Sequence, residues 1–301
     1  MAVQRSDGFE PRGRLLYDEP MSQHTSWRVG GPADLYFVPA DLGDLVDFLR
    51  LRHEKEWPVT WIGLGSNTLV RDGGIRGIVI ATHKSLGELE LRGDRTVYAQ
   101  VGVPCAKIAR LTAKQGLAGA EFFAGIPGTL GGALAMNAGA YGCTTWEVVQ
   151  HVETIDADGG IHRRRAKEFE IGYRSVRSPR EEWFVSAVLT LKAGDAVRSQ
   201  NQIREFLGSR ARTQPIQMPN AGSVFTNPPN DHAARLIESA GLKGTCVGGA
   251  CVSEKHANFI VNRGGASAAD IEALIGQVES RVHEMHGVSL KREVRILGEA
   301  S

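Results

Sequence analysis

The sequence predicts an α+β protein of two domains, and three observations support this. Runs of Val, Ile and Leu that are typical of strands alternate with glycine through residues 25–195, whereas helical apolar spacing becomes prominent in residues 200–300. A chain of 301 residues suffices for about two domains of ordinary size. Glycine accounts for 36 of the 301 residues, a larger share than the usual value of about 7%, and the glycines occur in clusters.

Overall composition excludes several classes of protein. A net charge of +1, from 35 Lys+Arg against 34 Asp+Glu, argues against a general nucleic-acid binder or a polybasic membrane-surface protein. The basic run 162–165 follows an Asp-Gly-Gly turn and is predicted to be a solvated hairpin arm. No apolar stretch approaches the roughly 20 residues that span a bilayer, and residues 1–20 do not resemble a signal peptide. We therefore expect a soluble, cytoplasmic protein.

The four cysteines are Cys105, Cys143, Cys246 and Cys251. None forms a C-x-x-C pair, and four cysteines in a chain of this length do not make a disulfide scaffold, so reduced thiols are expected. The spacing of Cys246, Cys251 and His256 fits no common zinc pattern, and no metal site is predicted.

Element by element, residues 1–22 show no periodicity and are predicted to form an arm. Asp41 is placed to cap a helix whose apolar face includes Leu45 and Leu49, and Pro104 begins a second helix that ends at Gly116. These helices lie within a domain predicted at 23–195. Its strands are predicted at 35–38, 59–62, 77–80, 96–101, 148–155, 161–165 and 183–191.

The second domain is predicted at 196–301. Ser267 and Asp270 form a capping box before an amphipathic helix that ends at Gly287. Two further helices are predicted at 199–212 and 234–240, and two strands at 259–261 and 288–297.

The first glycine cluster, residues 63–68, follows a predicted strand. Its backbone N–H groups, with the side chains of Ser66 and Asn67, would make a concave anion site suited to phosphate. It is not a P-loop, because no Gly-Lys-Ser/Thr follows, and Thr68 replaces the third glycine of a Rossmann fingerprint. A plain glycine turn between strands is the alternative.

The second glycine cluster, residues 125–142, contains almost only small side chains, which would let a flat cofactor lie against the backbone. Thr129 is placed to cap a helix from Leu130, whose N-terminus would face a pyrophosphate. Tight packing of a helix on a sheet is the alternative.

Polar residues at three further places are ambiguous by themselves. Ser223 and Asn227 stand among apolar residues and can be turn formers. Arg174, beside Tyr173, and Glu293, which shares a strand face with Arg295, can be members of surface ion pairs.

Taken together and in order, these segments resemble the UDP-N-acetylenolpyruvoylglucosamine reductase family, flavoenzymes of peptidoglycan precursor synthesis. The resemblance covers residues 22–298. It rests on the segments 25–31, 63–67, 125–133, 136–140, 173–174, 221–228, 241–244, 256–259 and 293–294.

The resemblance implies an FAD-binding domain of the vanillyl-alcohol oxidase (PCMH) type, in two subdomains, followed by a smaller α+β substrate-binding domain. FAD should be noncovalent, because no His or Cys accompanies Ser66 and Asn67. The implied cofactor-binding residues are Gly63, Gly65, Ser66, Asn67, Gly125, Ile126, Pro127, Gly128, Thr129, Gly131, Gly132, Asn137, Ala138 and Gly139.

The implied reaction transfers a hydride from NADPH through FAD to the enolpyruvyl ether of a UDP-sugar, which gives UDP-N-acetylmuramate. The resemblance makes Ser223 the proton donor, Arg174 the partner of the substrate carboxylate, and Glu293 an assisting group. It makes Tyr173, Asn227, Lys243 and Asn258 substrate contacts.

One departure concerns a loop with a substrate-covering tyrosine that one branch of the family inserts before the Gly-Ser segment. Residues 192–220 are short and contain no tyrosine, so the shorter branch is expected. A monomer is expected as well. The alternatives are an FAD oxidoreductase of the same cofactor class with another substrate, a nucleotide-binding regulator without activity, and a Rossmann-type NAD dehydrogenase.

Overall fold

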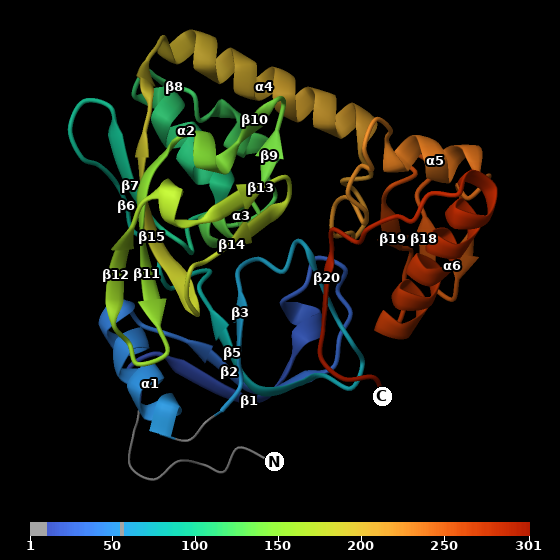
Figure 1. Cartoon of the computed structure of the whole chain (residues 1–301), viewed down its shortest axis with the longest axis horizontal. Helices are drawn as coiled ribbons and strands as arrows, with labels where there is room; N and C mark the ends of the chain where they lie inside the picture. Colours follow the sequence, from blue (N-terminus) through green and yellow to red (C-terminus); the bar gives the residue numbers. More distant parts are fainter. Residues whose placement is uncertain (1–10, 55–56) are drawn as a thin grey trace.

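The computed structural model describes residues 11–54 and 57–301, in which a larger domain and a smaller one are joined by a long helix (Figure 1). The first sheet of the larger domain has one antiparallel edge strand, β1, while its other three strands run parallel. In spatial order the strands are β1 (Arg14–Pro20), β2 (Pro32–Val38), β5 (Ile75–Ala81) and β3 (Val59–Ile62). Helix α1 (Leu42–Glu54) begins after Asp41, whose carboxylate accepts the N–H of Asp44 at 2.9 Å.

The second sheet is antiparallel throughout. Its strands, in spatial order, are β12 (Ile161–Arg164), β11 (Val149–Asp156), β15 (Glu182–Thr190), β7 (Thr96–Gln100) and β6 (Leu89–Leu91). One apolar core joins the two sheets, since Phe37 and Ile80 of the first belong to the same buried cluster as Val97 and Val152 of the second. The cleft described below is therefore held between two packed layers.

Short elements complete the larger domain. Helix α2 (Cys105–Lys114) precedes the second glycine cluster, and helix α3 (Leu130–Ala135) lies within it. The strand pairs are β8 (Leu117–Ala118) with β16 (Lys192–Ala193), β9 (Gly139–Ala140) with β10 (Cys143–Thr144), and β13 (Glu170–Gly172) with β14 (Ser175–Arg177). The 3-10 helices are η1 (Met21–Gln23), η2 (Glu121–Gly125), η3 (Thr145–Glu147) and η4 (Ala166–Glu168).

The smaller domain follows helix α4 (Ala196–Thr213), which runs along one side of the molecule (Figure 1). It contains α5 (Ala233–Ser239), α6 (Ala268–His286) and the sheet β17 (Cys246–Val247), β18 (Ala250–Val252) and β19 (Ile260–Asn262). Ser267 and Asp270 form the predicted capping box of α6, and Gly287 ends the helix at a φ of +66°. Trp27, Val29 and Leu69 of the first part of the chain are buried in this domain's core, so the two domains share an apolar interface.

The final strand, β20 (Arg295–Leu297), leaves the smaller domain and pairs in parallel with β4 (Thr68–Val70). Strand β4 follows the first glycine cluster directly. The end of the chain is thereby fixed beside the residues predicted to bind phosphate.

Most predicted elements are confirmed, but two are corrected. Within the segment 1–22, predicted as an arm, Arg14–Pro20 forms edge strand β1, and residues 1–10 lie outside the described part. The strand predicted at 288–297 is reduced to Arg295–Leu297, because the N–H groups of Glu293 and Val294 both point to the carbonyl of Val224 rather than to a neighbouring strand. Among the described residues, no helix is long and apolar enough to cross a membrane.

The prediction of reduced thiols is wrong for two cysteines. Cys246 and Cys251 form a disulfide, because a turn at Gly248 and Gly249 places them directly opposite each other on β17 and β18. Cys105, buried, and Cys143, exposed, are free. Within the described ranges no group of three or more His, Cys, Asp or Glu side chains is arranged to hold a metal ion.

Candidate active site

The two glycine clusters face each other across one cleft. Gly63, at the end of β3, lies so close to Thr129 that a Cβ at position 63 would stand 2.4 Å from the threonine hydroxyl oxygen. Gly65 has a φ of +60°, and a Cβ there would meet the carbonyl oxygen of His24 at 2.0 Å. Both positions therefore require glycine for the backbone to form the wall of the cleft. Ser66, Asn67, Gly128 and Gly132 also line it.

Thr129 does precede α3, but its side chain makes no capping hydrogen bond and lies against Gly63 instead. The first two N–H groups of the helix are also used, since Leu130 donates to Val103 O and Gly131 to Val101 O, each at 2.9 Å. The prediction that this helix start faces a pyrophosphate is therefore wrong for these two groups. Gly132 has open space where a Cβ would be, so a ligand can approach its backbone closely.

At one end the cleft opens into an aromatic cavity of about 250 Å³ that sequence reasoning missed. The rings of Trp61 and Trp183 stack there with centroids 5.3 Å apart. Trp61 Nε1 and Ser178 Oγ are buried without a hydrogen-bond partner among the described residues, which indicates that a ligand completes them. No motif marks these residues, because they come together only through the pairing of separate strands.

At the other end lies a chamber of about 300 Å³ where the three predicted catalytic residues meet. Arg174 occupies the two-residue turn between β13 and β14 at a φ of +53°. Its Nε lies 3.0 Å from Glu293 Oε1, yet this N–H has no aligned acceptor, so the contact is an ion pair rather than a directed hydrogen bond. Its Nη2 donates to the carbonyl of Gly139 at 3.1 Å. The surface ion pair considered for Arg174 is thus excluded.

Glu293 is only 12% exposed in its side chain, and burial raises its pKa although Arg174 acts in the opposite direction. Its backbone is held on both sides. The N–H donates to Val224 O at 2.8 Å, and the carbonyl accepts from Asn67 Nδ2 at 3.0 Å. Asn67, predicted to bind the cofactor, therefore also fixes the position of Glu293.

Ser223 lines the same chamber and follows Gly222, which has a φ of +75°. The segment is anchored by Asn258, whose side chain accepts the N–H of Phe225 at 3.0 Å and donates to its carbonyl at 2.8 Å. The serine is thus carried by backbone that the core of the smaller domain holds in place.

The four predicted substrate contacts lie elsewhere. Asn227 accepts the N–H of Ala233 at the start of α5, Lys243 pairs with Glu238 at 2.7 Å, and Asn258 holds Phe225. Tyr173 is 60% exposed beside Arg174. None of the four is among the described residues that line the three cavities above, and their direct contact with substrate stays a prediction.

Two further residues of the chamber were missed by sequence reasoning. Arg210, in the last turn of α4, lines the chamber and the adjoining cavity of about 400 Å³, and burial lowers its pKa. Tyr141, at a φ of +54°, stacks on Phe206 of α4 with ring centroids 3.8 Å apart. The sequence predicted α4 but not which of its side chains face the chamber.

Comparisons with known proteins agree with this geometry. Residues 33–164 match a family model described as FAD binding domain. The fold and the cleft thus define an FAD-binding protein, as predicted. Residues 214–297 match the model of the UDP-N-acetylenolpyruvoylglucosamine reductase C-terminal domain. Together with the curated relatives described next, this match shows that the chain belongs to the UDP-N-acetylenolpyruvoylglucosamine reductase family.

Individual relatives support this assignment over nearly the whole chain. The chain is 58% identical to the UDP-N-acetylenolpyruvoylglucosamine reductase of Alkalilimnicola ehrlichii and 57% identical to that of Methylococcus capsulatus, covering 96% of this chain in both cases and 96% and 95% of the relatives. Among solved structures, the UDP-N-acetylenolpyruvylglucosamine reductase of Thermus caldophilus matches with a TM-score of 0.81 and 31% identity, over 95% of this chain and 99% of that one.

Proposed function

We propose that this protein reduces UDP-N-acetylglucosamine enolpyruvate to UDP-N-acetylmuramate, with NADPH as reductant and FAD as cofactor. The observation that carries the proposal is the chamber itself. Arg174, Ser223 and Glu293 come from three distant segments and meet beside the cleft formed by the glycine clusters. Family membership supplies the substrate and the cofactor.

The shape of the cleft fits FAD in three parts. The aromatic cavity, with its unpartnered Trp61 Nε1 and Ser178 Oγ, suits the adenine, and the narrow part at Gly63 and Gly132 suits the pyrophosphate. The chamber wall at Ala138 and Gly139 suits the flavin ring. No His or Cys is among the described residues that line these cavities, which supports noncovalent binding.

Trp183→Ala should therefore weaken binding of FAD much more than binding of FMN, which has no adenine. We expect a loss of about 1–3 kcal/mol, the usual value of stacking one base on an aromatic side chain. Fluorescence titration of the flavin-free protein measures both affinities. Trp27→Phe, in the core of the smaller domain, is the control. Equal losses for FAD and FMN would show that the adenine lies elsewhere.

FAD held in the glycine-lined cleft would supply the hydride that adds to C3 of the enolpyruvyl group. Negative charge then develops at C2 and on the substrate carboxylate, where the Arg174 guanidinium stabilises it. Ser223 donates the proton to C2, and the nearby guanidinium eases that loss. Glu293 Oε1 lies 3.0 Å from Arg174 Nε and orients the guanidinium. Through this contact Glu293 assists in polarising the enolate that forms.

The function is tested by the spectrum of the purified protein. A flavin absorption band should bleach with NADPH and return when the enolpyruvyl sugar is added. If NADPH bleaches the band and the sugar does not restore it, an FAD oxidoreductase with another substrate is favoured. A protein that binds no FAD would contradict the proposal.

We further propose that the protein belongs to the shorter branch of the family and acts as a cytoplasmic monomer. Most of residues 192–220 form α4 rather than a loop. In place of the tyrosine loop, the chamber is bordered by Arg210 of α4 and by Tyr141, whose hydroxyl donates to Phe206 O at 2.6 Å.

A further inference from the structure

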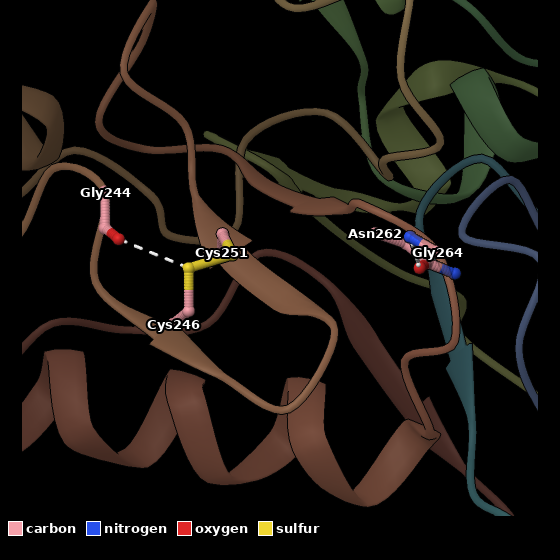
Figure 2. Close-up of a disulfide and its surroundings, with 5 residues drawn as sticks. All are labelled: Gly244, Cys246, Cys251, Asn262 and Gly264. Carbon is pink, nitrogen blue, oxygen red and sulfur yellow. Dashed lines mark hydrogen bonds between the residues drawn. A yellow bond between two sulfur atoms is a disulfide. The ribbon is translucent and has the colours of Figure 1, made fainter.

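We propose that Cys246 and Cys251 form a reversible redox site, a dithiol that is oxidised and reduced by small thiols of the glutathione class without unfolding of the domain. The proposal goes beyond the reductase reaction and does not depend on it. Figure 2 shows the disulfide between β17 and β18, with Gly244 beside it.

The hairpin alone brings the two cysteines together. Cys246 pairs directly with Cys251, and Val247 with Ala250, around the turn at Gly248 and Gly249. The Cα atoms are 4.1 Å apart, as expected of a pair whose side chains project from the same face. The thiols of the reduced protein would therefore remain neighbours, and the disulfide could form again without rearrangement of the backbone.

The bond contributes less to the stability of the fold than a cross-link over a long loop would. Cross-links stabilise mainly by closing long loops, whereas this one spans five positions that the hairpin already closes. Backbone hydrogen bonds fix the same segment, from Val252 N to Thr245 O at 2.9 Å and from Gly244 N to Val252 O at 3.0 Å. Val252 and Ala250 are wholly buried. A bond that the fold does not require is suited to exchange rather than to structure.

The two sulfur environments also suit exchange. Cys246 is exposed, whereas Cys251 is 3% exposed, so a reagent reaches one defined sulfur. Cys246 Sγ lies 3.2 Å from the carbonyl oxygen of Gly244. A disulfide sulfur has no proton to donate, but the reduced thiol would donate an S–H···O hydrogen bond to that acceptor. The same backbone therefore accommodates both redox forms.

The other thiols do not share this chemistry. Cys105 is wholly buried, and burial raises its pKa far above the usual range, so it does not form a thiolate. Cys143 is exposed and unbonded, and burial together with Glu147 raises its pKa. Disulfides in cytosolic proteins, where present, are usually transient and redox-active.

The exchange is balanced with glutathione as the reductant. A glutathione thiolate attacks Cys246 Sγ, the bond to Cys251 breaks, and Cys251 leaves as a thiolate that takes up a proton. A second glutathione attacks the glutathione sulfur of the mixed disulfide. This step releases the Cys246 thiol and glutathione disulfide, so two electrons pass to the protein.

Reduction should loosen the edge of the sheet locally. Strand β17 has two residues and no neighbour other than β18 in its sheet. Without the cross-link, the amides of Gly244 and Val252 should exchange with solvent faster by on the order of tenfold. The amide of Val224, which donates to Asn258 O, is the internal control.

The test equilibrates the whole protein in buffers from fully reduced to fully oxidised glutathione and counts thiols after denaturation. Cys143→Ser removes the exposed background thiol. We expect a step of two thiols within the range, absent from the double variant Cys246→Ser with Cys251→Ser. A pair that stays bonded, or stays reduced, throughout the range would overturn the redox site. Equal exchange at Gly244 and Val252 in both forms would overturn the loosening of β17.

Discussion

Ser223→Ala should leave reduction of the flavin by NADPH unchanged and slow its reoxidation by the enolpyruvyl sugar by about 10²- to 10⁴-fold, the usual contribution of a positioned proton donor. The two half-reactions separate because only the second needs a proton at C2. Rapid mixing of each substrate with the enzyme, followed at the flavin band, measures the two rates. The fold should tolerate the change, because Ser223 lies at the chamber wall rather than in the core.

Thr226→Ala is the matched control for this variant. Thr226 lies on the same segment and its hydroxyl donates to the carbonyl of Lys291 at 3.2 Å, away from the chamber lining. It should leave both half-reactions near the rates of the unaltered enzyme. A Ser223→Ala enzyme that loses both steps equally would show that Ser223 acts in binding or folding and not as the acid.

Glu293→Gln should separate activity from stability. Loss of the carboxylate removes the partner that orients the Arg174 guanidinium toward the developing negative charge, and we expect reoxidation to fall by about 10²- to 10³-fold. The effect of this substitution on the free energy of unfolding should depend on pH. Burial holds the pKa of Glu293 above its ordinary value of 4.5, so the native state binds the proton more tightly than the unfolded chain does.

The sign of the stability effect follows from this upward shift. As pH rises from the unfolded pKa through the native one, the native state must lose a proton that it holds tightly, and the free energy of unfolding decreases. Glutamine lacks this dependence. The Tm of Glu293→Gln relative to the unaltered protein should therefore increase over the pH range that begins at the ordinary glutamate pKa of 4.5 and extends upward. Calorimetry across this range measures it.

Glu284→Gln, on the exposed face of α6, is the control for removing one negative charge at the surface. A relative Tm for Glu293→Gln that falls with rising pH would mean that the ion pair with Arg174 outweighs burial. In that case the charged carboxylate would be the form that the fold favours.

The elements that local patterns determine could be predicted from the sequence. Apolar spacing predicted α1, α4 and α6, and Ser267 predicted the start of α6. The ordered motifs also predicted that Arg174, Ser223 and Glu293 serve one site, and the chamber brings them together.

The features that depend on long-range contacts could not be predicted from the sequence. Cys246 and Cys251 pair because of a hairpin register, and the Trp61–Trp183 stack depends on which strands lie side by side. The N–H groups of Leu130 and Gly131 donate to the carbonyls of Val103 and Val101, and the spacing of residues in the sequence does not predict these hydrogen bonds. Arg210 faces the chamber because of the path of α4 across both domains.

The parallel pairing of β20 with β4 also bears on how the chain is made. The partner of Thr68–Val70 is synthesised more than two hundred residues later, at Arg295–Leu297. At about 5–20 residues per second, the nascent chain waits roughly 10–45 seconds with β4 unpaired. During that interval the cleft lacks the clamp between Asn67 and Glu293. Completion of the cofactor cleft therefore waits until residues 293–297 have been synthesised. A fragment ending near residue 195 would expose an open strand edge to other chains.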